Sequence, residues 1–166
     1  MKNKRGQMKI SFGMIFTIIL IIFFMAFAFF TIKKFIDIQK QAQIGSFLED
    51  LKKDVDEKWN SMKSDKEYTY VLPTKIKKVC FVNLKNPSGS GVDKSYMEEF
   101  DLNSIGHENL FFYPMDAAEG MPSKEIKHIN ITKITDPRNP YCILNQKGKV
   151  KITIKKDYGD NFVILK

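Results

Sequence analysis

The sequence predicts an α+β protein, in which a long N-terminal transmembrane and amphipathic helix is followed by a small antiparallel β domain. Two observations support the helix: an uncharged apolar run fills Ile10–Ile32, and the apolar residues after it recur at helical spacing as far as Met62. Beyond residue 65 the pattern changes to short alternating runs separated by turn residues, which is typical of antiparallel strands.

The run Ile10–Ile32 is long enough to cross a membrane. At about 1.5 Å per residue it reaches roughly 35 Å as a helix, whereas the hydrocarbon core of a bilayer is about 30 Å thick. We therefore predict a transmembrane helix over residues 7–33. A cleaved secretory signal peptide is the alternative, because Ala26-Phe27-Ala28 has the form of a cleavage site. Apolar residues continue past that site, however, and make the run longer than the usual apolar region of a signal peptide.

Residues 34–64 are predicted to continue this helix in amphipathic form, so that one helix extends from about Met8 to Met62. Its apolar stripe needs a partner, which is either the protein's own sheet or another helix. Gly45 is expected to be a weak point where the helix bends or melts locally. The residues of the stripe are Phe35, Ile36, Ile44, Phe47, Leu48, Leu51, Val55, Trp59 and Met62.

Residues 65–166 are predicted to form an antiparallel sheet or sandwich of about six strands. Ser64–Glu67 is expected to be a linker, and Lys94–Leu102 a short helix after the loop Asn86–Asp93. The last three strands are expected to form a meander. The segments with strand character are Tyr68–Leu72, Lys75–Val82, Leu110–Tyr113, Ile126–Ile134, Tyr141–Asn145, Val150–Lys155 and Asn161–Leu165.

Composition limits the function classes. The chain has 166 residues, with 27 basic and 19 acidic side chains, and after the membrane segment there is room for one domain of roughly 100 residues. The basic side chains form no arginine-rich stripe, so we expect no nucleic-acid binding. Basic residues before the apolar run, namely Lys2, Lys4, Arg5 and Lys9, favour a cytoplasmic N-terminus. We therefore expect a single-pass cell-membrane protein whose residues 65–166 are extracellular.

The two cysteines, Cys80 and Cys142, both lie in segments with strand character. In an exported small domain such a pair is expected to form a disulfide, and two buried free thiols are the alternative. The chain has no CxxC pair and no Cys/His spacing that indicates a metal site.

Other polar residues give weaker signals. His107 and His128 are predicted to be ordinary surface histidines. The sequon Asn130-Ile131-Thr132 is a candidate glycosylation site, with Asn130 expected on the water-facing side of its strand. No nucleophile, metal or phosphate motif is recognisable, so we expect neither an enzyme nor a cofactor.

Acidic residues gather beside the glycine-rich loop, at Asp93, Glu98, Glu99 and Asp101. Such a group is a candidate calcium site, but its spacing matches no EF-hand. We therefore interpret it as the solvated start of a helix.

The stretch Lys4-Arg5-Gly6-Gln7 is a basic tail that ends in glycine shortly before the apolar run. It resembles the class III signal peptides of archaeal type IV pilins and archaellins, and the resemblance covers roughly residues 4–60. It implies that a prepilin peptidase cleaves after Gly6, so that residues 1–6 are a leader and Gln7 becomes the new N-terminus. It also implies that the helix stays in membrane lipid until it packs against other pilin-like subunits in a cell-surface filament.

One position departs from the family pattern. Pilins usually carry a glutamate five residues into the mature chain, and this chain has Ser11 there. The alternative hypothesis is therefore a single-pass membrane protein that never polymerises, with an extracellular β domain acting as an envelope binding or stator module, as in the archaellar stator proteins. Cleavage after Gly6 favours the pilin-like hypothesis, and an intact basic tail favours the alternative.

Overall fold

The computed structural model describes residues 12–85 and 93–166 and has the α+β architecture that the sequence predicts. Its first element is the long helix α1, Phe12–Trp59. The chain divides into two compact units, Met1–Ile38 and Gln39–Lys166. The helix passes through Gly45 without interruption and ends before the predicted Met62.

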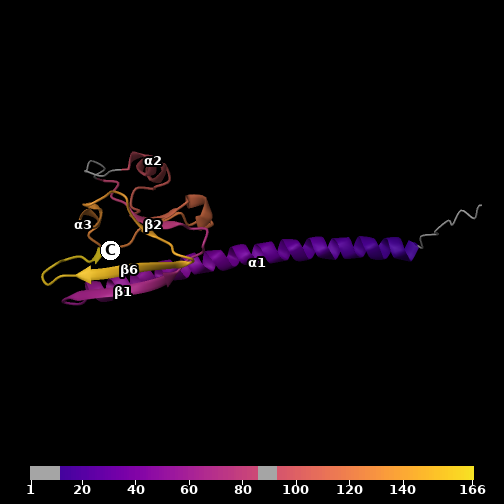
Figure 1. Cartoon of the computed structure of the whole chain (residues 1–166), viewed down its shortest axis with the longest axis horizontal. Coiled ribbons are helices and arrows are strands. Elements are labelled where there is room, and N and C mark those ends of the chain that lie inside the picture. Colours follow the sequence, from indigo (N-terminus) through magenta and orange to yellow (C-terminus); the bar gives the residue numbers. More distant parts are fainter. Residues whose placement is uncertain (1–11, 86–92) are drawn as a thin grey trace, which may run out of the picture. The chain divides into compact units, whose positions relative to one another are not determined.

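One sheet has three strands, β1 (Ser64–Val71), β6 (Lys149–Lys156) and β7 (Ile164–Leu165), in the order β1-β6-β7. Both pairings are antiparallel, and β1 and β6 lie side by side in Figure 1. The linker predicted at Ser64–Glu67 is wrong, because these residues begin β1 and pair with β6. Their backbone groups join the ladder while their polar side chains stay largely in water, which composition alone does not reveal.

The second sheet has four strands in the order β4-β3-β2-β5, all antiparallel. These strands are β2 (Lys78–Phe81), β3 (Leu110–Tyr113), β4 (Ser123–Lys124) and β5 (Tyr141–Leu144).

The predicted meander of the last three strands is wrong for β5, which pairs with β2 and lies in a different sheet from β6. The tight turn between them has left-handed backbone at Lys147 (φ 54°) and Gly148 (φ 87°). On one side of this turn the Asn145 N–H donates to the Lys77 carbonyl (2.9 Å), and on the other the Leu72 N–H donates to the Gly148 carbonyl (3.0 Å). These bonds hold β5 beside β2 and direct β6 to β1.

Three short helical elements complete the described part of the fold. The helix α2 (Lys94–Leu102) has the predicted bounds, and a 3-10 helix, η1, spans Met115–Ala118. The strand predicted at Ile126–Ile134 is wrong, because its second half belongs to the helix α3 (Ile131–Thr135). Asn130 is the N-cap of α3, where its Oδ1 accepts the Lys133 N–H (3.0 Å). This cap satisfies a helical donor and prevails over the alternating apolar pattern.

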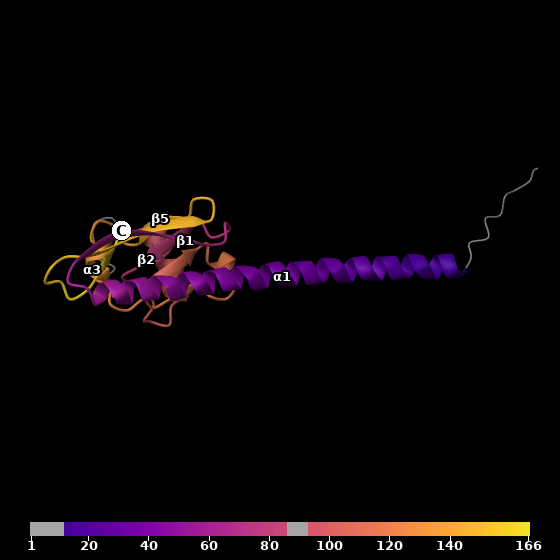
Figure 2. The same ribbon diagram turned by 90° about the horizontal axis from the view of Figure 1, so that it is seen from below.

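The main core is formed by side chains of the outer part of α1, from Ile44 to Val55, and of the two sheets. Figure 2 shows this end of α1 running alongside the strands. Phe47 connects all three, because its ring packs edge-on against Tyr70 of β1 (centroids 5.4 Å apart) and Phe112 of β3 (5.7 Å). The Tyr70 hydroxyl donates to Asp54 Oδ2 (2.7 Å), and burial together with this carboxylate raises the pKa of Tyr70.

The predicted apolar stripe of the helix is only partly buried. Its buried residues are Ile44, Phe47, Leu48, Leu51 and Val55.

A second, smaller core lies under α2, on the opposite face of the four-stranded sheet. Strand alternation divides the side chains between the two cores: in β3, Leu110 and Phe112 belong to the main core, whereas Phe111 packs with Phe100 of α2. All buried members of both cores come from residues 44–165. The unit Gln39–Lys166 therefore contains its own hydrophobic core.

Leu51 provides a test of the packing of α1, because its side chain is 0% exposed within the main core. In a protein of residues 39–166, we expect Leu51→Ala to lower the free energy of unfolding by about 2 to 5 kcal/mol, the usual cost of truncating a buried leucine. Lys52→Ala, at the exposed neighbouring position, is the matched control and should change it by about 0.5 kcal/mol or less. Urea unfolding measures both, and equal values for the two variants would contradict burial of the stripe.

Candidate membrane anchor and binding cleft

The inner part of α1, Phe12–Ile38, carries the apolar run. Its side chains from Phe12 to Ile36 are all exposed. Among the described residues, α1 is the one helix long and apolar enough to span a membrane, judged by length and composition. Two hydroxyls within the run bond to the helix itself, Thr17 to the Gly13 carbonyl and Thr31 to the Phe27 carbonyl, both at 2.8 Å. A helix in lipid must satisfy its polar groups internally, and these threonines fulfil that condition.

The processing positions Gly6 and Gln7, and Ser11 with them, lie outside the described residues. Their roles stay predictions from the sequence.

Cys80 and Cys142 form the predicted disulfide. They stand directly opposite each other on β2 and β5, with their Cα atoms 4.0 Å apart. Both pack on the α2 side of the sheet with the second core. The disulfide therefore joins two neighbouring strands that are separated by 62 residues in the sequence.

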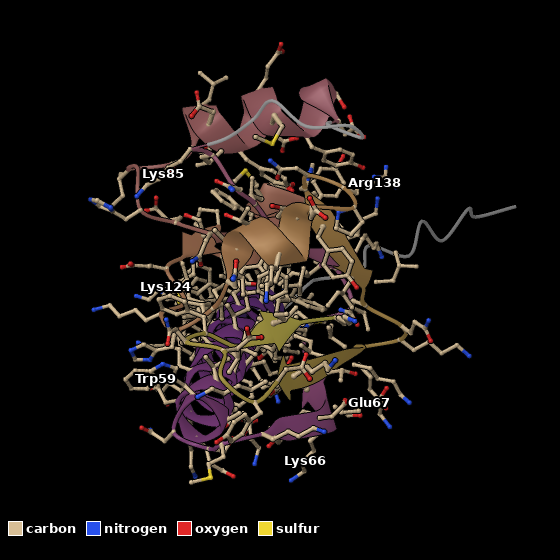
Figure 3. The ribbon with its side chains drawn as sticks, turned by 90° about the vertical axis from the view of Figure 1, so that its left-hand side faces the viewer. Trp59, Lys66, Glu67, Lys85, Lys124 and Arg138 are labelled. Carbon is tan, nitrogen blue, oxygen red and sulfur yellow. A yellow bond between two sulfur atoms is a disulfide. The ribbon has the colours of Figure 1, made fainter. Side chains whose placement is uncertain are left out.

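A cleft of about 380 Å³ opens beside this disulfide. Four parts of the chain build it: Lys78 of β2, Tyr96 of α2, the segment from Pro137 to Pro140, and β5. Among the described residues, its lining is Lys78, Asp93, Tyr96, Pro137, Arg138, Pro140, Tyr141, Cys142 and Leu144. Figure 3 shows Arg138 on the α2 side of the domain, away from Trp59 and Glu67.

The charged groups of the cleft are of both signs. Lys78 Nζ lies 3.1 Å from the Tyr96 hydroxyl and over the rings of Tyr96 (5.1 Å) and Tyr113 (5.8 Å). Arg138 Nη2 lies 3.8 Å from Asp93 Oδ2, so this ion pair is longer than a hydrogen bond. Aromatic faces next to charged groups can bind polar and apolar ligand parts together, which makes the cleft the candidate binding site of the domain.

The histidines differ from each other. His107 is exposed, as predicted. His128 is half-buried and has specific partners, because its ring stacks on Trp59 (centroids 3.7 Å apart) and its Nδ1 lies 2.8 Å from Asp56 Oδ1. Trp59 Nε1 in turn donates to the Asn161 carbonyl (2.9 Å). This cluster fastens the end of α1 to the C-terminal part of the domain, which gives His128 a structural role.

The acidic residues beside the loop do not converge. Asp93 is the N-cap residue of α2, where its Oδ1 accepts the Ser95 hydroxyl (2.8 Å), while Glu98 and Asp101 are exposed and Glu99 is half-buried. Within residues 12–85 and 93–166, no group of three or more His, Cys, Asp or Glu side chains is arranged to hold a metal ion.

Asn130 does not lie on the wet face of a strand, because its side-chain oxygen caps α3. Glycosylation at Asn130 stays a prediction from the sequon.

Comparisons with protein families, curated proteins and solved structures find no match for this chain. The function is therefore inferred from the chain's own residues.

The sequence did not point to the cleft. Lys78, Tyr96, Arg138 and Leu144 come from four separate segments, and no spacing rule links them. A signal was available in the two cysteines, because a bridge between them requires β2 and β5 to be neighbours.

The disulfide gives a second prediction. In the chain-entropy model a bridge across 62 residues stabilises the fold by about 4 kcal/mol. We therefore expect the double variant Cys80→Ala, Cys142→Ala to have a free energy of unfolding that is lower by up to about 4 kcal/mol, and so to unfold at a lower denaturant concentration. Denaturant unfolding of both proteins measures the difference. Adding a reductant should lower the unfolding midpoint of the parent protein and leave that of the double variant unchanged. Two free thiols in the non-reduced parent, detected by mass spectrometry, would contradict the bridge.

Proposed function

We propose that this protein is a type IV pilin-like subunit, held in the cell membrane by the inner part of α1 until it assembles into a cell-surface filament. In this proposal the β domain is extracellular, and the partners of the chain are membrane lipid, a prepilin peptidase and other pilin-like subunits. The domain acts by binding and assembly rather than by catalysis.

The observation that supports the proposal is that the two parts of α1 have different surroundings, one exposed and one buried in the domain. One helix carries an exposed apolar stretch, Phe12–Ile32, followed by a stripe from Ile44 to Val55 that is buried in an antiparallel β domain. A pilin-like subunit needs both parts, because its apolar stretch must be stable first in lipid and then among neighbouring helices. Lipid tails are as apolar as these side chains, so the transfer costs little and depends on packing.

The disulfide supports an exported domain. Structural disulfides persist in oxidising compartments and are rare in the cytosol. The basic residues ahead of the apolar run favour the same topology, with the N-terminus inside.

The second candidate function is a membrane-held binding or stator module that does not polymerise. Ser11 favours it, because the glutamate at this position usually pairs with a neighbouring subunit's N-terminus in pilin-like assembly. The cleft between α2 and β5 would then be the working surface of the module.

Processing separates the two candidates. When the protein is produced together with a prepilin peptidase, we expect its mature chain to begin at Gln7 and to occur in filaments sheared from the cell surface. Intact-mass spectrometry gives the N-terminus, and electron microscopy with an antibody to the β domain identifies the filaments. Gly6→Leu is the control, and it should keep residues 1–6 and remain in the membrane.

A parent chain that keeps residues 1–6 and is found only in the membrane would contradict the pilin-like function and favour the binding module. A mature chain that begins after Ala28 would contradict both candidates, because the anchor would be removed.

A further inference from the structure

The strand β5 lies at one edge of the four-stranded sheet, with β2 on one side and no strand of the described residues on the other. The bond from the Asn145 N–H to the Lys77 carbonyl fixes which residues of β5 bond inward. Since antiparallel pairs alternate, Tyr141 and Ile143 exchange hydrogen bonds with β2. The backbone N–H and C=O groups of Cys142 and Leu144 therefore point away from the sheet.

This edge lacks the protection that the other sheet has. The edge strand β1 carries three consecutive charged side chains, Asp65, Lys66 and Glu67, which discourage the addition of another strand. The residues of β5 are all uncharged, and Leu144 is 56% exposed. A row of unpaired backbone groups beside exposed apolar side chains is a template for strand pairing.

The binding cleft lies against this edge. Cys142 and Leu144, the residues whose backbone groups point outward, both line the cleft. In an antiparallel pair, residues that stand opposite each other place their side chains on the same face of the sheet. A strand added to β5 would therefore direct the side chain opposite Cys142 into the cleft.

We propose that β5 pairs antiparallel with β5 of a second copy of this chain. A two-fold axis at Ile143 places Cys142 of each copy opposite Leu144 of the other, so that all the outward N–H and C=O groups of both strands find partners. Leu144 of the second copy then enters the cleft beside Cys142. A strand that satisfies itself in this way makes an isologous contact, in which both copies use the same surface.

The charges of the cleft fit a second copy. Each copy offers the Arg138 guanidinium, which is 67% exposed, together with the Asp93 carboxylate, and their 3.8 Å separation leaves both able to bond across an interface. Self-association brings two such mixed pairs together, whereas a purely acidic ligand would be repelled by Asp93 and a purely basic one by Lys78 and Arg138. This interface goes beyond the proposed function, because it does not use the apolar part of α1.

Hydrogen exchange on the full chain in detergent tests this interface without any substitution. We expect exchange of the Cys142 and Leu144 amides to slow about tenfold as the protein concentration rises and pairing becomes nearly complete. The amides of Thr69 and Val71 are the internal control, because they point outward from the unpaired edge of β1 and should not respond. Exchange at Cys142 and Leu144 that does not depend on concentration overturns the proposal.

A matched pair of variants gives a second test. Leu144→Lys places a charge on the β5 edge, and Val71→Lys does the same on β1, where Val71 is 58% exposed and Leu144 56%. We expect Leu144→Lys to be monomeric by light scattering and to lose the concentration dependence of exchange, and Val71→Lys to dimerise like the parent protein. A parent protein that is monomeric throughout, or dimers that survive Leu144→Lys, overturn the proposal. If the dimers that survive Leu144→Lys form only in chains that contain the apolar part of α1, the chains associate through this helix. That result overturns the β5 interface but leaves the proposed function intact.

Discussion

The fold depends on the packing of one phenylalanine. Phe47 lies on the buried stripe of α1 and contacts Tyr70 in one sheet and Phe112 in the other. Within the described residues the two sheets share no strand pairing, and the helix contributes side chains to the core that they have in common. Because residues 44–55 of α1 form part of the domain core, a flexible linker could not replace this part of the helix. The apolar segment Phe12–Ile32 is therefore continuous with an element on which the fold of the β domain depends.

The four-stranded sheet uses both of its faces, and this explains where the surface features lie. One face packs on α1, so the other can carry α2, the disulfide and the cleft. The disulfide joins β5 to β2 and makes a four-residue edge strand a firm part of the sheet. A short strand with an open edge can then serve as a contact surface without fraying.

The sequence predicted the helices and strands that follow from a periodic pattern, and it missed the strand pairings and the cleft, which depend on contacts between residues far apart in the chain. Helical spacing located the stripe from Ile44 to Val55, a short apolar run located β3, and alternation located β6, because all three patterns are local. The pairing of β5 with β2 was missed, since it is decided by the turn at Lys147 and by a bond between Asn145 and Lys77. The strand predicted through Asn130 failed because a single cap bond favours a helix there. The cleft could not be predicted, since its residues come together only in the folded domain.

The measurement that tests the central role of α1 most directly compares two fragments by NMR spectroscopy. Residues 39–166 contain the complete main core, whereas residues 60–166 lack Ile44, Phe47, Leu48, Leu51 and Val55. The account predicts well-dispersed amide signals and cooperative unfolding for residues 39–166. For residues 60–166 it predicts amide signals of poor dispersion and no cooperative transition. A well-dispersed spectrum and cooperative unfolding of residues 60–166 would contradict it, because the sheets would then form a core without the helix.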